Sequence, residues 1–517
     1  MAKNSKLRKA SKNILVPTVR WREVHPMGVV CRSDAYYAKM AGRIAGMIRD
    51  MIGNSVDATE DDIVDVAVEL AAYLEDKING INLWNAFMAL YREKFGRVYP
   101  FYDVREDELL DDEPNLPDVR FILWRAFNRI SSASLLNPLT QPISILAGII
   151  HDFLIDEFES APESPEFVEA IYAADKYDDV IYLRSMCSWL AARSYLTAVY
   201  DMEYCFEKIF DIYKSIVGDN DNINEMMLAY GIEAYFAFNA EIGPLALTAP
   251  AWLGKMMELS GNDAVRKLAP GISAIRTKTM LPYDIKAVEQ DGFKVESLAG
   301  DIMEMTFDPL PENVWGDVRV GHQIITTLFE YNGKWKVNGM SSITPKKMDF
   351  SPAKADYAKR LDSQKNSYDW NISKNNGSRI GVAADMKELK ARFGLDKVKN
   401  PKIDESVLDD VDNAKEILYF INDDGSMSIL PDCASCVAIP DNPYYNVSEA
   451  TARGAMILCG HESSKEMRQY IMDNGLMPDA RLASPSIPDS EAKTWFAENA
   501  PFLVALTHSD DVEVNMP

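Results

Sequence analysis

The spacing of apolar residues changes near residue 276, and this change constrains the fold more than any other feature of the sequence. From about 34 to 275 apolar residues recur at helical spacing, as in "DAYYAKMAGRIAGMIRDMI". Thr59 precedes the next such run and is a suitable helix N-cap. Beyond 276, apolar and polar residues alternate, and Asn332-Gly333 separates two strand-like runs in the manner of a β-hairpin. The sequence therefore predicts a helical part followed by a small antiparallel sheet or half-barrel.

A chain of 517 residues is too long for a single core, so several domains are expected. Residues 346–378 are rich in Lys, Ser, Asp and Asn and poor in aliphatic residues, which is typical of an exposed linker. We predict an α+β multidomain protein with a mainly α-helical N-terminal domain, a small antiparallel β domain and a mixed α/β C-terminal domain. The expected parts are a flexible basic arm (1–18), the helical domain (19–275), the β domain (276–345), the basic linker (346–378) and the mixed domain (379–517).

The net charge of −25 is unevenly distributed along the chain. Residues 1–50 contain 11 Lys or Arg and 3 Asp or Glu, a net charge of +8, so the remainder carries −33. Such an acidic body repels nucleic acid and anionic lipid at long range. A nucleic-acid contact would therefore use the basic arm, although an arm of this kind is more commonly a disordered solubilising tail. Its basic residues are Lys3, Lys6, Arg8, Lys9 and Lys12.

Three Cys and one His near the C-terminus have the spacing C-x2-C-x22-C-x-H. Zinc takes four N or S ligands in structural sites, and a CxxC pair supplies two of them. However, "CVAI" from Cys436 onward also suits a buried strand, and C-x-H is an uncommon ligand spacing. We therefore expect these cysteines to pack in a core, with a zinc site as the alternative. The candidate metal ligands are Cys433, Cys436, Cys459 and His461.

The sequence contains none of the common catalytic motifs, such as a phosphate-binding loop, a dinucleotide fingerprint, an HExxH helix or an EF-hand loop. His151, Asp152 and Asp156 share one predicted helix and could bind a metal. A solvated acidic face is the commoner meaning of such a stripe. His25 is expected to lie in an ordered loop. These observations favour a protein that is not an enzyme.

Six cysteines in a chain of this length do not form a disulfide scaffold. Cys31, Cys187 and Cys205 have apolar or helical surroundings and are expected to be buried small hydrophobic residues. The most apolar run, "ISILAGIIHDFLI", is too short to cross a bilayer and contains His151 and Asp152. The basic N-terminus is not followed by the apolar core of a signal peptide. We therefore expect a soluble cytoplasmic protein that does not span a membrane.

Several short stretches together resemble an uncharacterised bacterial family that carries a long domain of unknown function. They are "YLEDKINGINLWNAF…FGRVYPFYD", "DVRFILW", "DNPYY" and "NGLMPDA". The resemblance covers most of the chain beyond the basic arm. It implies no activity or cofactor, so no functional residue is carried over. It weakens the zinc alternative, because its recurring features are aromatic, Pro and Asp residues rather than the cysteines of "CASC".

The missing catalytic motifs, the uneven charge and the many aromatic residues favour an interaction or scaffold role, in which the chain binds a macromolecular partner, most simply a protein. The enzyme alternative is a metal-dependent hydrolase or nuclease that uses the Cys/His set or the helical carboxylates. A second alternative is a small-molecule binder that uses the β domain. No cofactor is expected under the first hypothesis, and zinc is expected under the enzyme alternative.

Overall fold

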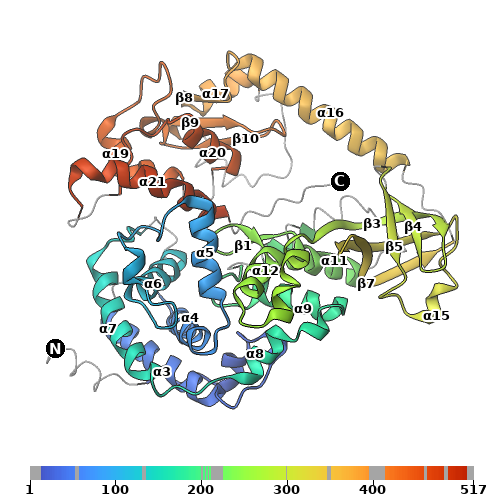
Figure 1. The fold of residues 1–517 in the computed structure, drawn as a ribbon. Helices are drawn as coiled ribbons and strands as arrows, with labels where there is room; N and C mark the ends of the chain where they lie inside the picture. Colours follow the sequence, from blue (N-terminus) through green and yellow to red (C-terminus); the bar gives the residue numbers. More distant parts are fainter. Residues whose placement is uncertain are drawn as a thin grey trace. The chain divides into compact units, whose positions relative to one another are not determined.

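The computed structural model describes residues 13–52, 58–130, 136–199, 202–203, 205–207, 209–210, 225–297, 300–345, 351–394, 414–458, 463–482 and 487–508 (Figure 1). The chain divides into two compact units. The first unit contains the described residues up to 345, except for a short segment at 136–139. The second unit contains that segment and the described residues from Ser351 to His508.

The first unit begins with a body of helices, as the apolar spacing predicts. The helices are α2 (Thr18–Arg22), α3 (Asp34–Ile52), α4 (Glu60–Asn79), α5 (Leu83–Phe95), α6 (Leu116–Ile130), α7 (Gln141–Phe158), α8 (Pro165–Tyr172), α9 (Val180–Ala192), α11 (Glu225–Phe238), α12 (Ala249–Leu259), α13 (Asp263–Arg266) and α14 (Ala269–Ser273). Shorter elements are the 3-10 turns η1 (Pro26–Gly28), η2 (Glu106–Glu108) and η3 (Ala174–Lys176) and the strands β1 (Glu241–Ile242) and β2 (Leu247–Thr248).

Helix α4 begins and ends where its sequence predicts. The Thr59 side chain accepts a hydrogen bond from the backbone N–H of Asp62 (3.1 Å), and the Asp62 carboxylate accepts one from the N–H of Thr59 (2.8 Å). The predicted N-cap is therefore confirmed. Gly80 follows the helix in the left-handed conformation that glycine adopts without a steric penalty.

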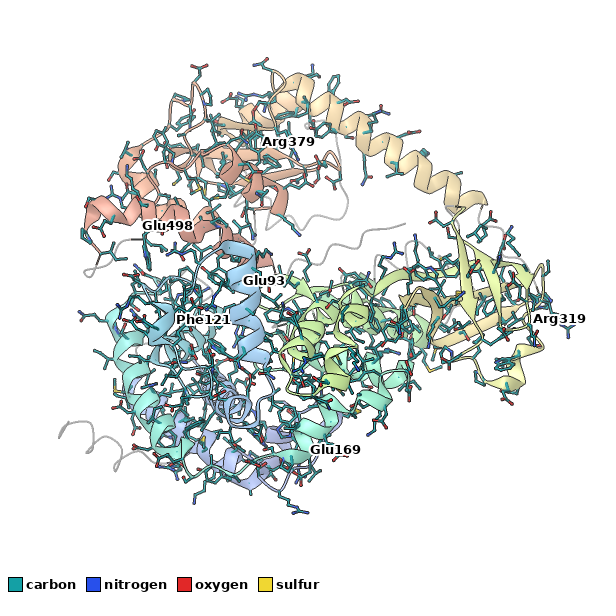
Figure 2. All side chains as sticks on the ribbon, in the orientation of Figure 1. Glu93, Phe121, Glu169, Arg319, Arg379 and Glu498 are labelled. Carbon is teal, nitrogen blue, oxygen red and sulfur yellow. The ribbon has the colours of Figure 1, made fainter. Side chains whose placement is uncertain are left out.

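Aromatic rings fill the core of the helical body (Figure 2). Phe121 of α6 lies 5.2 Å from Phe87 and 6.0 Å from Trp84 of α5, measured between ring centroids. Trp124, one turn along α6, is also fully buried. Rings of this size bury much apolar area each and favour offset or edge-to-face contacts, so they dominate the packing of α5 against α6.

Two buried carboxylates connect the helices of this body. Asp118 of α6 accepts hydrogen bonds from the hydroxyls of Tyr73 (2.5 Å) and Tyr99 (2.9 Å). Asp76 of α4 accepts one from the hydroxyl of Tyr195 (2.7 Å). Burial raises the pKa of both carboxyls, and the tyrosine hydroxyls offset this only in part. Each carboxylate thus ties together segments that are far apart in the sequence.

Strands β3 (Arg276–Val288), β4 (Gly292–Glu296), β5 (Ile302–Thr306), β6 (Gln323–Tyr331) and β7 (Lys334–Thr344) form a closed barrel (Figure 1). Its strand order is β3-β4-β5-β7-β6, and β6 pairs with β3. The β5–β7 pair is parallel, and the other pairs are antiparallel. Helix α15 (Glu312–Trp315) lies between β5 and β6, where Leu310 and Val318 flank it and enter the barrel core. This order and helix position give the topology of the OB-fold, a five-stranded barrel.

A small, mainly antiparallel β structure is confirmed where the sequence predicts one, and its hairpin lies where expected. Asn332 and Gly333 both have positive φ (52° and 73°) and join β6 to β7, as a type I′ turn requires. The barrel packs on the helical body within the same unit. The ring of Phe329 on β6 stacks on Phe238 of α11 at 5.7 Å, and the Thr277 hydroxyl bonds to Asn239.

The second unit is a small mixed α/β structure. Its sheet has the antiparallel order β10-β9-β8, with β8 (Ile380–Asp385), β9 (Lys415–Ile421) and β10 (Met427–Leu430). Its helices are α16 (Ser351–Lys374), α17 (Met386–Phe393), α19 (Val447–Ile457), α20 (Lys465–Asp473) and α21 (Asp489–His508), and η5 (Ala434–Cys436) is a 3-10 turn. The core of the sheet and α17 includes Leu389, Phe393 and Tyr419.

Helix α16 occupies the stretch for which the sequence predicts an exposed linker segment. The side chains described from 361 to 374 are mostly exposed, including Trp370. Tyr368 and Ile372 instead pack against the core of the sheet. The helix was not predicted because its few apolar residues form no continuous stripe at helical spacing.

The α+β architecture is therefore confirmed, with a helical N-terminal part, a small β barrel and a mixed C-terminal unit. Across the described parts of the chain, no helix combines the length and apolarity needed to cross a membrane.

Candidate functional sites

The predicted zinc set is only half covered by the described residues, because Cys459 and His461 lie outside them. Cys433 is partly buried, and Cys436 closes turn η5, with its thiol 3.8 Å from the carbonyl oxygen of Glu449. The strand expected from Cys436 onward does not form: the chain leaves η5 in an irregular segment. Burial raises the pKa of Cys436, which favours the neutral thiol over the thiolate that binds metals. The zinc prediction remains a prediction.

The helical carboxylate set lies on α7. His151 is partly buried with Nε2 3.2 Å from the carbonyl oxygen of Pro114, whereas Asp152 and Asp156 are exposed. The imidazole thus contacts backbone on a side of α7 that is turned inward, while the carboxylates face solvent. The basic residues of the arm lie outside the described residues, which begin at residue 13, so a nucleic-acid contact there also remains a prediction. Its residues are Lys3, Lys6, Arg8, Lys9 and Lys12.

A buried polar cluster lies where the loop between α2 and α3 meets helix α4. His25 in this loop has no exposed surface, and its Nε2 lies 2.9 Å from the Glu75 carboxylate of α4. Its Nδ1 lies 3.2 Å from the carbonyl oxygen of Val29. The Trp189 indole N–H donates to the carbonyl of Val24 (2.7 Å) and fixes the start of the loop. The loop is therefore ordered, as expected.

Cys31 and Asp34 lie on the Nδ1 side of His25. The Cys31 sulfur is 3.8 Å and the Asp34 Oδ1 is 3.9 Å from Nδ1, and the three atoms lie within 4.8 Å of one another. Arg22 Nε holds the other carboxylate oxygen, Oδ2, at 2.5 Å. Oδ1 itself is buried and has no hydrogen-bond partner among the described residues. We call His25, Cys31, Asp34 and Glu75 the His25 cluster.

Two serines extend the cluster behind Glu75. The Ser164 hydroxyl donates to Glu75 Oε1 (2.5 Å), and the hydroxyls of Ser33 and Ser164 lie 2.6 Å apart. Burial lowers the pKa of His25, but the Cys31 thiol and the Glu75 carboxylate together raise it to about 10. Only 4% of Cys31 is exposed, so a bulky substrate has no route to its sulfur. The donor set of imidazole, thiol and carboxylate suits a single buried ion rather than catalysis on a large substrate.

An open cavity of about 500 Å³ is lined in part by the residues on either side of Ser164 in the chain, Glu163 and Pro165. Asn79, Glu163 and Glu169 supply polar groups to it, and Tyr172 and Val168 supply apolar surface (Glu169 is labelled in Figure 2). The Asn79 side chain accepts a hydrogen bond from the Ser164 N–H, so the cavity wall and the serines of the cluster share one turn. The wall thus belongs to the same ordered region as the cluster.

One end of the barrel exposes apolar side chains. Trp315 of α15 is 40% exposed, although its ring stacks on Phe307 (4.9 Å between centroids) and its indole N–H donates to the carbonyl of Leu310 (2.8 Å). Phe307 in turn lies 5.6 Å from Phe293, which is paired across the sheet with the exposed Val288. Val320 follows α15 and is 64% exposed. We call Val288, Phe307, Trp315 and Val320 the barrel tip.

The β4–β5 face of the barrel carries charges that cancel. Lys294 of β4 lies between Glu289 (3.3 Å) and Glu304 (3.4 Å), and Lys334 also reaches Glu304 (3.3 Å). Oligonucleotide-binding barrels use this face, and they need excess positive charge and stacking rings there. The ion pairs described on this face leave no excess positive charge, so they disfavour nucleic acid as its ligand.

A family model matches residues 15–286 and 351–508. The chain belongs to the DUF3843 family, proteins of unknown function. The expected resemblance to a family with a long domain of unknown function is confirmed. The DUF3843 match covers the loop of the His25 cluster and helix α4, but it omits 287–350, which contains β4 to β7 and the whole barrel tip. No curated protein and no solved structure matches the chain.

Neither the His25 cluster nor the barrel tip was predicted from the sequence, for different reasons. Within the DUF3843 segments, His25, Cys31 and Asp34 form the spacing H-x5-C-x2-D, which is visible in the sequence and could have been noted as a ligand pattern. Glu75 follows His25 by 50 positions, so no local pattern connects them. The exposure of Trp315 depends on how the β5–β6 segment closes the barrel, and this is also a long-range property.

Proposed function

We propose that the protein acts by binding a protein partner through the barrel tip. The observation that carries this proposal is that the Trp315 side chain is fixed in position by two contacts and is still partly exposed to solvent. Stacking on Phe307 and the hydrogen bond to Leu310 fix the indole, so little side-chain entropy is lost when a partner covers it. Tryptophan is among the residues most enriched in the energetic centres of protein interfaces.

The surroundings of Trp315 support a protein rather than a nucleic acid as the partner. Val288 and Val320 add exposed apolar area at the same end of the barrel, as in the core of an interface. The neighbouring β4–β5 face offers paired Lys and Glu side chains, a polar rim with no excess positive charge. Arg319, which is labelled in Figure 2, lies at this end of the barrel.

The test places a photo-crosslinking amino acid at Val320 in the full-length protein, in cells of its natural source. The expected result is one discrete adduct with a protein, and this adduct disappears when Trp315→Ala is added. Loss of a central tryptophan costs about 2 kcal/mol or more, which is roughly thirtyfold in affinity. Trp370→Ala is the matched control, because Trp370 is also exposed but lies in the second unit.

Two results would contradict the proposal: no adduct from Val320, or an adduct that survives Trp315→Ala. An adduct of twice the mass of the chain would identify a second copy of this protein as the partner. A crosslinker at Ile145 on α7, which is exposed on the helical body, should give no such adduct.

A further inference from the structure

We infer that His25, Cys31 and Asp34 bind a divalent transition metal of the zinc type, independently of the proposed partner. The three ligand atoms are His25 Nδ1, Cys31 Sγ and Asp34 Oδ1. They lie within 4.8 Å of one another and come from the α2–α3 loop and the first residue of α3. Two of the separations, 3.8 Å and 3.9 Å, are close to the roughly 3.4–3.6 Å edges that tetrahedral zinc bonds of 2.0–2.3 Å imply.

Asp34 provides a second, independent observation at the same place. Only 2% of this residue is exposed, and its Oδ1 has no hydrogen-bond partner among the described residues. An unpaired buried carboxylate oxygen is costly, so an occupant is expected beside it. Arg22 holds Oδ2 at 2.5 Å and thereby directs Oδ1 toward Cys31 and His25. A cation at the centre of the three atoms would satisfy it.

Glu75 prepares His25 for this role. A histidine that binds metal through one nitrogen usually donates its other N–H to a carboxylate, which fixes the ring and the tautomer. In a metal-bound His25, Nε2–H would donate to Glu75 Oε2 at 2.9 Å, and the metal would replace the proton through which Nδ1 bonds to the Val29 carbonyl oxygen at 3.2 Å. Ser164 holds the other Glu75 oxygen at 2.5 Å, so the carboxylate is itself fixed. Glu75 is thus a positioning residue rather than a ligand.

The donor set selects the metal class. A thiolate ligand disfavours Mg²⁺ and Ca²⁺, which take oxygen donors, whereas nitrogen and sulfur together suit Zn²⁺ and Co²⁺. Three protein ligands leave a fourth position, and the Val29 carbonyl oxygen, 3.2 Å from Nδ1, is close enough to the cluster to fill it. The cluster is buried, so the metal would hold the α2–α3 loop against α4 rather than act on a substrate.

The experiment measures metal per chain in the full-length protein, purified without chelators or affinity tags, by elemental mass spectrometry. About one zinc per chain is expected in the wild type and less than a tenth of this in Cys31→Ser and Asp34→Asn. Cys187→Ser is the matched control, because Cys187 is also a fully buried thiol, and it should keep the metal. Cys433→Ser/Cys436→Ser should keep it as well.

A second measurement keeps the inference testable if the loop variants fail to fold. Co²⁺ added to metal-free wild-type protein should produce a thiolate-to-cobalt absorption band at one equivalent. Glu75→Gln should weaken Co²⁺ binding roughly 10–100-fold without removing the band. The inference is overturned if the wild type holds no metal and Co²⁺ gives no band. It is also overturned if the Cys433→Ser/Cys436→Ser protein loses the metal while Cys31→Ser retains it.

Discussion

Two glycines within helices differ in how much space surrounds them, and this difference decides what a substitution at each would do. A Cβ built on Gly42 of α3 would lie 2.2 Å from the carbonyl oxygen of Ile14, a backbone atom that cannot turn away. A Cβ on Gly148 of α7 would meet nothing within 4 Å. The Ile14 N–H also donates to the Gly42 carbonyl (3.0 Å). The backbone at Ile14 therefore packs directly against α3 at Gly42, where no side chain intervenes.

Alanine at these two positions should therefore change stability in opposite directions. Both changes gain the helix propensity of alanine, about 0.5–1 kcal/mol over glycine in a helix interior. Gly148→Ala should raise the free energy of unfolding by that amount. Gly42→Ala should lower it, because the methyl group displaces the segment that begins at Ile14. Urea unfolding followed by tryptophan fluorescence measures both, and equal effects at the two positions would contradict the role of this contact.

At the scale of elements, helices α4 and α6 are joined by hydrogen bonds more specific than apolar packing. Asp118 has two tyrosine donors and a third donor, Asn115 Nδ2 at 3.2 Å. An amide in place of this carboxylate would present an N–H₂ group to groups that are themselves donors. Breaking such a buried arrangement leaves polar groups unpaired, at a cost of about 1–3 kcal/mol.

The stability lost in Asp118→Asn should depend on pH. Burial raises the pKa of Asp118, so the folded protein binds its proton more tightly than the unfolded chain does. The contribution of Asp118 to stability is therefore larger below its ordinary pKa of 3.8 and falls as pH rises through the raised value. The asparagine that replaces Asp118 in the variant has no titratable proton, so the variant lacks this contribution to the pH dependence of stability. The difference between wild type and variant should be larger near pH 4 than at pH 7, and urea midpoints at both pH values test this.

The sequence predicted helices and strands where neighbouring residues determine them. It did not predict which strands or side chains pair across long distances in the sequence. Thr59 and the Asn332-Gly333 turn identified a helix start and a hairpin because each acts through neighbours within three residues. The parallel contact of Met305 with Trp335 closes the barrel across 30 positions, and alternation of apolar residues does not encode it. His25, Cys31 and Asp34 form a local pattern, but the pairing of His25 with Glu75 of α4 could not be predicted, for the same reason.

At the scale of the whole molecule, charge is the property that separates this protein from an average chain. The net charge is −25, so like charges repel throughout the folded surface. Local ion pairs such as Arg20 with Asp61 (2.9 Å) relieve this only in part, because exposed pairs contribute little each. The balance between repulsion and pairing decides how salt affects stability.

Repulsion should outweigh pairing, so added salt should stabilise the protein. Raising NaCl from about 10 mM to 150 mM shortens the screening length from about 30 Å to 8 Å and weakens the long-range repulsion most. The urea midpoint should increase over this range, and sucrose at equal osmolality is the control for a general solute effect. A midpoint that falls with salt would show that the surface ion pairs are the larger contribution.

Adjacent residues of α4 bring two separate polar systems onto one helix: Glu75 faces the His25 cluster and Asp76 faces Tyr195. Inserting or deleting one residue upstream in α4 would rotate both side chains by about 100° about the helix axis. Neither carboxylate could then reach its partners, and compensation would require simultaneous changes in the α2–α3 loop, at Ser164 before α8 and at Tyr195 after α9. Natural variation within this helix is therefore expected as substitutions at constant length, with gains and losses of residues confined to the segments around it.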